Sequence, residues 1–274
     1  MPHFTTPDGI SLHFTDEGAG TPILCLAGLT RNGADFDHVA PQLAGHRTIR
    51  LDSRGRGLSD WADPETYTIP QESADALALL DHLGLERAAI LGTSRGGLIA
   101  MTIAILAKDR LTGVCLNDIG PVIETKGLGT IETYIGRTPP QKTYEEAARS
   151  RAILWRAFHD VPHERWLAEV RAHYEETSEG LALRYDPALG DVFRAGASSK
   201  AIPDMWPLFD AFEGLPLALI RADGSDILSK ATADEMARRR PDMIRAEVSG
   251  RGHVPFLDEP EARDAIARWL DLLP

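Results

Sequence analysis

The stretch LGTSRGGL, residues 91–98, decides how the rest of the chain is interpreted. It places Ser94 between glycines at positions 92 and 96, at the junction of two apolar runs. The run at 88–93 is typical of a buried strand, and the run at 97–107 is typical of a buried helix. We therefore predict a tight strand–turn–helix, in which a side chain at 92 or 96 would collide with the neighbouring strand and helix.

The pattern Gly-x-Ser-x-Gly in this setting indicates a nucleophile. A tight turn of this kind holds the serine in a strained conformation and presents its oxygen at the tip. The turn also opens a helix, and the free N–H groups there favour negative charge.

A serine hydroxyl needs a base to take its proton, and the stretch SGRGHVPF, residues 249–256, offers one. His253 follows the last predicted strand, and the glycines around it allow the loop to fold back over the sheet edge. The base in turn needs a carboxylate to fix its tautomer. Asp118, Asp223 and Asp226 all follow predicted strand ends, and an Asp-Gly turn also explains Asp223. The residues alone leave this choice open.

The order of apolar strands and helices predicts an α/β fold. Strands are expected at 11–18, 22–28, 46–52, 88–93 and 111–117, with helices at 35–43, 69–83 and 97–107. Nearly all-apolar strands that alternate with helices indicate a mostly parallel sheet covered on both faces. From 121 to 213 only helices (143–159 and 164–177) and loops are expected. The alternation then resumes, with strands at 216–223 and 243–250 and helices at 230–239 and 261–272. We therefore predict an α/β core of 1–120 and 214–274 and a helical cap insertion of 121–213.

Composition excludes several classes of function. The 274 residues carry a net charge of -12, which argues against nucleic acid or an anionic membrane as a partner. No signal-peptide pattern opens the chain and no apolar run is long enough to span a bilayer, so we expect a cytoplasmic protein. Cys25 and Cys115 lie in apolar runs and are expected as buried, reduced thiols. His159 and His163 are four residues apart, but Pro162 interrupts a helix there, so we expect no metal site. A homodimer stays open.

Taken together, several segments resemble the α/β-hydrolase family. They are LAGLTRNGADF (26–36), LDSRGRGLSDW (51–61), the Ser94 turn, LNDIGP (116–121), SDILS (225–229) and GRGHVPFLDEP (250–260). The chain is most similar to the branch of capped serine esterases, enol-lactone hydrolases and carbon–carbon bond hydrolases. Many members have His-Gly where this chain has Ala27-Gly28, so hydrogen bonding in that loop is expected to differ.

The resemblance implies roles for particular residues. Ser94 would be the nucleophile, His253 the base and Asp226, in preference to Asp223, the acid. The backbone N–H groups of Leu29 and Arg95 would bind the oxyanion, with no metal or organic cofactor. The implied function is a serine hydrolase that cleaves a small ester or lactone through an acyl-enzyme. The alternatives are a carbon–carbon bond hydrolase of keto or diketo acids and a non-catalytic receptor for a small ligand.

Four further side chains are candidates for the substrate pocket. Arg31 and Asn32 follow the oxyanion loop, and Trp206 and Phe209 lie near the return to the core. Arg31 and the Arg95 side chain have two interpretations. They grip a substrate carboxylate, which favours a lactone or keto acid, or they pair with acidic neighbours and brace loops.

Overall fold

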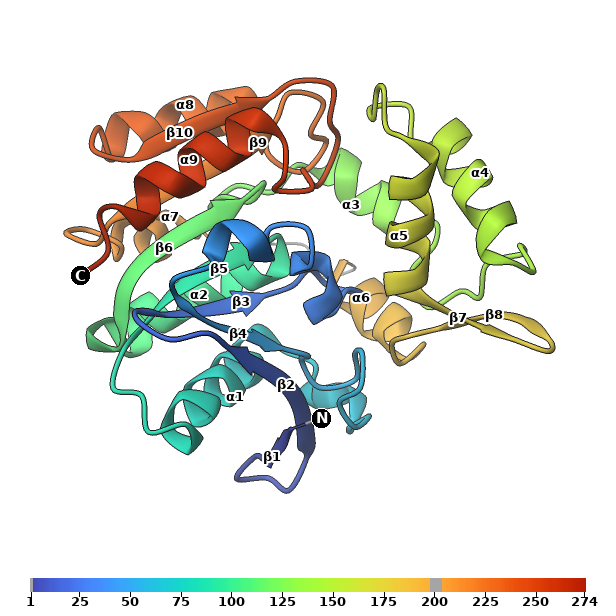
Figure 1. Cartoon of the computed structure of the whole chain (residues 1–274), viewed down its shortest axis with the longest axis horizontal. Helices are drawn as coiled ribbons and strands as arrows, with labels where there is room; N and C mark the ends of the chain where they lie inside the picture. The colour runs from blue at the N-terminus through green and yellow to red at the C-terminus, as the bar shows by residue number, and fades with distance from the viewer. Residues whose placement is uncertain (1, 198–203) are drawn as a thin grey trace.

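The computed structural model describes residues 2–197 and 204–274, and in these residues it contains an eight-stranded sheet (Figure 1). The strand order is β1-β2-β4-β3-β5-β6-β9-β10. The two pairs β1–β2 and β2–β4 are antiparallel, and the pairs from β4 to β10 are parallel. The mostly parallel sheet predicted from the apolar runs is confirmed. The strands are β1 His3–Thr5, β2 Ser11–Glu17, β3 Pro22–Leu26, β4 Arg47–Leu51, β5 Ala88–Thr93, β6 Leu111–Asn117, β9 Leu217–Ala222 and β10 Ile244–Val248.

Successive side chains of a strand point to opposite faces of the sheet. Because these strands are apolar on both faces, helices cover both. In β3, Leu24 packs in the cluster that contains α1 (Ile69–His82), α2 (Arg95–Leu106) and α8 (Lys230–Arg239). The adjacent Cys25 packs in the cluster on the other face, with Trp269 of α9 (Pro260–Leu270). Cys25 and Cys115 are buried and free, as predicted, and burial raises the pKa of Cys25 to about 12.

Two local predictions are wrong. The helix expected over 164–177 ends early, as α5 (His163–His173), and the chain continues into a hairpin of β7 (Tyr174–Thr177) and β8 (Gly180–Leu183). Gly180, the first residue of β8 after the turn, has φ 124°, a conformation that suits glycine. The helix expected over 35–43 is instead two short 3-10 turns, η1 (Gly33–Phe36) and η2 (Ala40–Leu43), since Pro41 has no N–H to donate to a longer helix.

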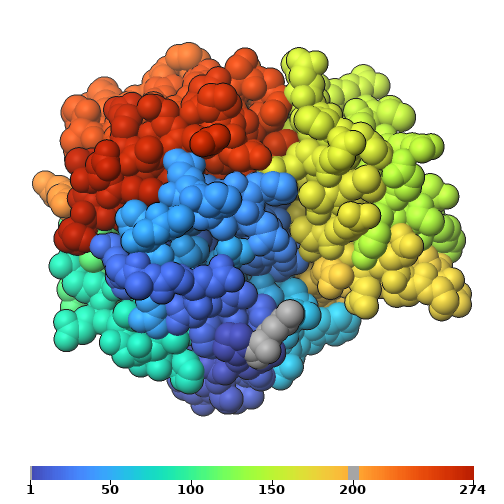
Figure 2. Space-filling view, viewed as in Figure 1, coloured from blue at the N-terminus to red at the C-terminus, as the bar shows by residue number. Residues whose placement is uncertain are grey.

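The residues between β6 and the end of α6 (Leu189–Ala197) form a block beside the sheet (Figures 1 and 2). Its helices are α3 (Thr125–Glu132), α4 (Tyr144–Leu154), α5 and α6 (Leu189–Ala197). Backbone hydrogen bonds from Gly57 to Arg184 and from Asp186 to Gly55, both 2.8 Å, attach the block to the loop after β4. We propose this block as the cap; residues 198–203 of the predicted insertion lie outside the described residues.

The last helix of the insertion, α7 (Trp206–Asp210), packs with the core instead of the cap. Phe209 and Phe212 are fully buried in the same cluster as α2. Within residues 2–197 and 204–274, no helix has the length and apolar character needed to cross a membrane.

Candidate functional site

Ser94 lies at the turn between β5 and α2, as predicted, with φ 50° and ψ -112°. The two flanking glycines are required by close packing. A Cβ at position 92 would lie 2.7 Å from the backbone of Gly96, and a Cβ at position 96 would overlap the carbonyl oxygen of Leu26. The strained serine is therefore held by contacts that no larger residue at either position allows.

His253 reaches Ser94 from the loop between β10 and α9. Its Nε2 lies 2.9 Å from Ser94 Oγ, which is hydrogen-bond distance for proton transfer. The loop is braced from the sheet, because the Asn117 side chain donates to the carbonyl of Pro255 at 3.1 Å. The structure thus brings the predicted nucleophile and the predicted base together.

The carboxylate beside His253 belongs to Asp118. Asp118 Oδ2 lies 2.8 Å from His253 Nδ1, and its side chain is completely buried. Asp118 follows β6 with φ 55°, which turns its side chain toward the site. Two further donors hold it: the backbone N–H of Ala222 at 2.9 Å to Oδ1, and the Ser225 hydroxyl at 2.7 Å to Oδ2.

Gly28 lies directly beside the nucleophile, since a Cβ there would be 3.8 Å from Ser94 Cβ. The backbone of Leu29 follows it, and the Leu29 carbonyl accepts a hydrogen bond from Arg56 Nε at 2.9 Å. The position of Leu29 after Gly28 fits the expectation that the N–H groups of Leu29 and Arg95 both bind the oxyanion beside Ser94. We retain both as proposed oxyanion donors.

Comparison with known proteins places this fold and geometry in a family. Residues 23–265 match the model of the alpha/beta hydrolase family. The chain belongs to the alpha/beta hydrolase family. The fold class and the family resemblance drawn from the sequence are therefore confirmed.

Individual relatives cover nearly the whole chain of this alpha/beta hydrolase. It is 35% identical over 255 residues to 3-hydroxybutyrate-oligomer hydrolase of Cupriavidus necator, which covers 89% of this chain and 86% of that protein. It is 28% identical over 268 residues to 2-(acetamidomethylene)succinate hydrolase of Mesorhizobium japonicum, covering 96% and 92%. The crystal structure of an alpha/beta hydrolase from Novosphingobium aromaticivorans has 39% identity and a TM-score of 0.93, covering 99% and 98%.

The prediction of Asp226 as the partner of His253 is wrong in this alpha/beta hydrolase. Asp226 accepts a hydrogen bond from the Thr130 hydroxyl at 3.1 Å, whereas the hydrogen bond to His253 Nδ1 is made by Asp118. Asp223 accepts hydrogen bonds from Ser249 and from the backbone of Arg251, both at 3.3 Å. The segment after β9 nevertheless supports the acid, because its Ser225 hydroxyl donates to Asp118.

The Arg95 side chain braces the core of the hydrolase through Glu72 and Tyr67. Its Nε and Nη2 donate to buried Glu72 at 2.7 and 2.8 Å, and Nη2 also donates to the Tyr67 carbonyl at 3.0 Å. Burial alone would raise the pKa of Glu72, but the charges of Arg56 and Arg95 lower it. The bracing interpretation of Arg95 is confirmed.

Arg31 and Asn32, also predicted for the pocket, both make contacts within the protein. Arg31 pairs with Asp35 at 3.0 Å and Glu169 at 3.4 Å, although it also lines a cavity. Asn32 accepts from the backbone of Ala34 and donates to the carbonyl of Ala172 at 2.8 Å, so it ties η1 to α5.

The prediction that Phe209 forms the pocket wall is wrong, whereas that for Trp206 stays a prediction. Phe209 is fully buried in the core cluster, and the Arg239 guanidinium lies over the Trp206 ring at 4.1 Å. Neither residue lines the two cavities beside the site.

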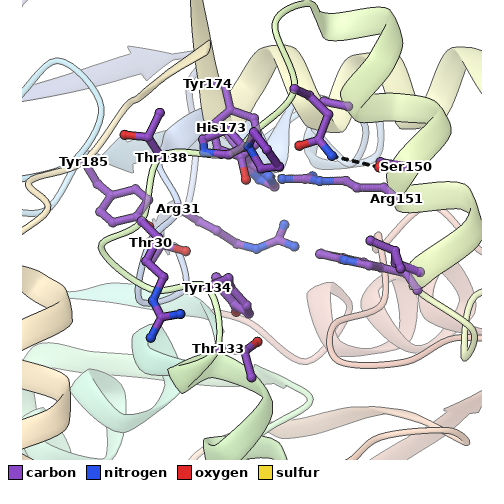
Figure 3. A pocket seen from close by; sticks show the side chains of 17 residues that line it. Thr30, Arg31, Thr133, Tyr134, Thr138, Ser150, Arg151, His173, Tyr174 and Tyr185 are labelled. Atoms are coloured by element: carbon purple, nitrogen blue, oxygen red, sulfur yellow. Dashed lines mark hydrogen bonds between the residues drawn. The ribbon is translucent and has the colours of Figure 1, made fainter. Parts of the chain in front are cut away.

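Two adjoining cavities lie between core and cap. One, of about 420 Å³, is lined by His253, Asp226 and Phe158. The other, of about 370 Å³, is lined by Arg31, Arg151 and Tyr185 and is shown in Figure 3. Tyr134 and Trp155 belong to the walls of both. Sequence reasoning missed Tyr134 and Arg151, because only the folded chain brings them to the walls of these cavities.

His173 connects the second cavity to the core of the hydrolase. Its Nδ1 lies 2.9 Å from Arg151 Nη1, and its Nε2 lies 3.0 Å from Asp35 Oδ1. Arginine can only donate, so His173 Nδ1 accepts and the ring is neutral with its proton on Nε2. Burial, together with the charges of Arg31 and Arg151, lowers the pKa of His173.

This lowered pKa predicts a loss of stability as the pH falls. In the unfolded chain His173 titrates near its ordinary pKa of about 6.5, so below that pH the unfolded state binds more protons than the folded state. The contribution of His173 is therefore present above about pH 6.5 and is lost at lower pH, with a slope of at most about 1.4 kcal/mol per pH unit. Urea unfolding at several pH values between 5 and 8 should show that the free energy of unfolding depends less steeply on pH in His173→Gln than in the wild type. Parallel profiles would contradict this assignment. Asp35 does not interfere, since its pKa is about 2.

Proposed function

We propose that this alpha/beta hydrolase is a serine hydrolase that cleaves a small ester or lactone through an acyl-enzyme. The single observation that carries the proposal is the continuous chain of hydrogen bonds Ser94–His253–Asp118, at 2.9 and 2.8 Å. A nucleophile, a base in contact with it and an acid that orients the base are the arrangement that acyl transfer requires. A purely binding protein has no need of all three.

In the proposed mechanism, His253 Nε2 takes the proton of Ser94 Oγ as that oxygen attacks the substrate carbonyl. Buried Asp118 keeps the other ring proton on Nδ1 and stabilises the imidazolium that forms. The N–H groups of Leu29 and Arg95 hold the developing oxyanion, and each donor of this kind lowers the barrier by about 3 kcal/mol. His253 then protonates the leaving group, and water releases the acyl group by the same route.

The relatives support an ester of a hydroxy acid as the substrate. The Cupriavidus necator protein is named for oligomers of 3-hydroxybutyrate, and it aligns along 89% of this chain. We therefore include the dimer of 3-hydroxybutyrate in the set of substrates to be tested.

Labelling with a fluorophosphonate tests the nucleophile directly. We expect peptide mass spectrometry to find the label on Ser94. The rate for His253→Ala should fall by about 100- to 10,000-fold, because the base is lost. His159→Ala is the matched control, since His159 is exposed in a neighbouring loop and its Nε2 hydrogen-bonds to the carbonyl of Arg156. Equal labelling of the wild type and His253→Ala would contradict the proposed activation of Ser94.

A substrate panel separates the alternatives. It contains 4-nitrophenyl esters, the 3-hydroxybutyrate dimer, lactones and 1,3-diketo acids. Hydrolysis of esters or lactones, lost in Ser94→Ala, supports the proposal. Turnover of the diketo acids alone would favour carbon–carbon bond cleavage by the same residues. Tight binding without turnover of any member would favour a receptor.

A further inference from the structure

The cavity of about 370 Å³ that adjoins the His253 cavity is positively charged, although the chain as a whole carries a net charge of -12. Arg31, Arg137 and Arg151 line it, and its described lining residues include no aspartate or glutamate. Figure 3 shows Arg31 and Arg151 entering the same space from opposite sides. A cavity of one sign with apolar walls concentrates a ligand of the opposite charge.

Arg151 differs from Arg31 in how its charge is balanced. Arg31 already has two carboxylate partners, Asp35 and Glu169. The Arg151 guanidinium donates to neutral His173 and lies over the rings of Trp155 and Tyr174, at 5.0 and 5.2 Å. In the part of the chain that the structure describes, no ion pair joins Arg151 to a carboxylate. Its charge is held in place, and a ligand can still neutralise it.

The cavity adjoins the one that contains His253. A Cβ at Gly28 would lie 3.2 Å from Arg31 Cδ and 3.8 Å from Ser94 Cβ, so Gly28 lies close to both the Arg31 side chain and Ser94. On the other side, Tyr134 and Trp155 form a wall shared with the cavity that contains His253. A ligand in this cavity thus lies in the space that adjoins the cavity of His253.

From these contacts we propose that Arg151 binds a carboxylate of the substrate, so that the preferred substrates are esters carrying a free carboxylate away from the bond that is cleaved. This inference rests on the proposed hydrolase function and specifies its substrate class. A guanidinium binds a carboxylate through two parallel hydrogen bonds, which gives orientation as well as affinity. His173 and the two rings hold the guanidinium in position for that contact.

Two matched substrate pairs test the proposal, one for each side of the ester bond. The first pair is the 4-nitrophenyl monoester of adipic acid and its primary amide. The second is 4-butanoyloxybutanoic acid and its primary amide. Each amide has nearly the size of its acid but no charge. The protein variants are Arg151→Met and Arg151→Lys, with Arg149→Met as the control, because Arg149 lies on the same helix, is exposed and pairs with Glu145.

We expect the wild type to prefer the acid over the amide in at least one pair. Arg151→Met should lower kcat/KM for that acid by about 10- to 100-fold, the usual effect of losing a hydrogen bond to a charged group. The amide should be nearly unaffected, Arg151→Lys should retain part of the preference, and Arg149→Met should behave as the wild type. No acid preference in either pair, or a preference that survives in Arg151→Met, overturns the proposal.

Calorimetry on Ser94→Ala separates this inference from the proposed function. If the wild type cleaves none of the four esters, but Ser94→Ala binds an acid and loses that binding with Arg151→Met, the carboxylate site stands and the hydrolase proposal falls. If the esters are cleaved without dependence on Arg151, the hydrolase stands and the carboxylate site falls. If neither turnover nor Arg151-dependent binding is found, both fall.

Discussion

Asp118→Asn is expected to lower kcat by about 10,000-fold while the protein remains folded, as for the buried aspartate of other serine triads. Asparagine has nearly the same shape, so it can still accept from the backbone of Ala222 with its amide oxygen. It cannot stabilise a positive imidazole ring, and its NH2 group facing His253 Nδ1 favours the wrong tautomer. The measurement is steady-state kinetics on a 4-nitrophenyl ester, with circular dichroism to verify the fold.

Asp226→Asn and Asp223→Asn are the matched controls for this experiment. Asp226 lies in the wall of the His253 cavity but hydrogen-bonds to Thr130, so its substitution should alter KM more than kcat. Asp223 contacts Ser249 and the backbone of Arg251, away from the His253 ring. If Asp226→Asn caused the large loss in kcat and Asp118→Asn did not, the hydrogen bond between Asp118 and His253 would have no catalytic role.

The Ser94 turn and the sheet could be predicted because their causes are local. Gly92 is required by contacts within the turn and Gly96 by the adjacent strand β3, but the Gly-x-Ser-x-Gly pattern itself is local, and a run such as 111–117 is buried over its whole length in β6. His253 was predictable for a similar reason, since it follows the last strand in a glycine-rich loop. These features depend on periodicity and backbone geometry, which a single sequence displays directly.

The acid and the pocket depend on contacts that are distant in sequence. Asp118 and Asp226 both follow parallel strands and therefore lie at the same edge of the sheet. Their spacing in the sequence does not show which of them is the hydrogen-bond partner of His253. The left-handed conformation of Asp118 and its hydrogen bond from Ser225 decide it. Arg151 becomes a pocket residue only because α4 packs against α5, which brings Arg151 beside His173 in the wall of the cavity. Phe209 was misplaced because aromatic residues in a helical stretch suit a pocket wall and a packed core equally well.

A buried network beneath the nucleophile connects the two proposed oxyanion donors. Glu72 of α1 accepts from Arg56 at 2.8 Å and from Arg95 at 2.7 Å, and Arg56 Nε donates to the carbonyl of Leu29 at 2.9 Å. One carboxylate thus holds the side chain of Arg95 and, through Arg56, the backbone of Leu29. Glu72 and Arg56 are each only 1% exposed at the side chain, so water cannot replace either partner.

Glu72→Ala is therefore expected to lower the free energy of unfolding by about 3–5 kcal/mol, because it leaves a buried guanidinium without its partner. Asp81→Asn, on the same helix, is the control, since Asp81 is exposed and its pair with Arg110 should contribute at most about 1 kcal/mol.

The more conservative Glu72→Gln tests positioning as well as stability. The glutamine side chain keeps one oxygen that can accept a hydrogen bond. Its NH2 group, however, faces arginine N–H groups, which also donate. We expect kcat to fall by about 10- to 100-fold, approaching the effect of losing one oxyanion donor, while KM changes little. Urea unfolding and steady-state kinetics on the same preparations separate the two effects. A purely structural role would lower stability and leave kcat of the folded fraction unchanged, whereas a positioning role requires kcat to fall in protein that is fully folded.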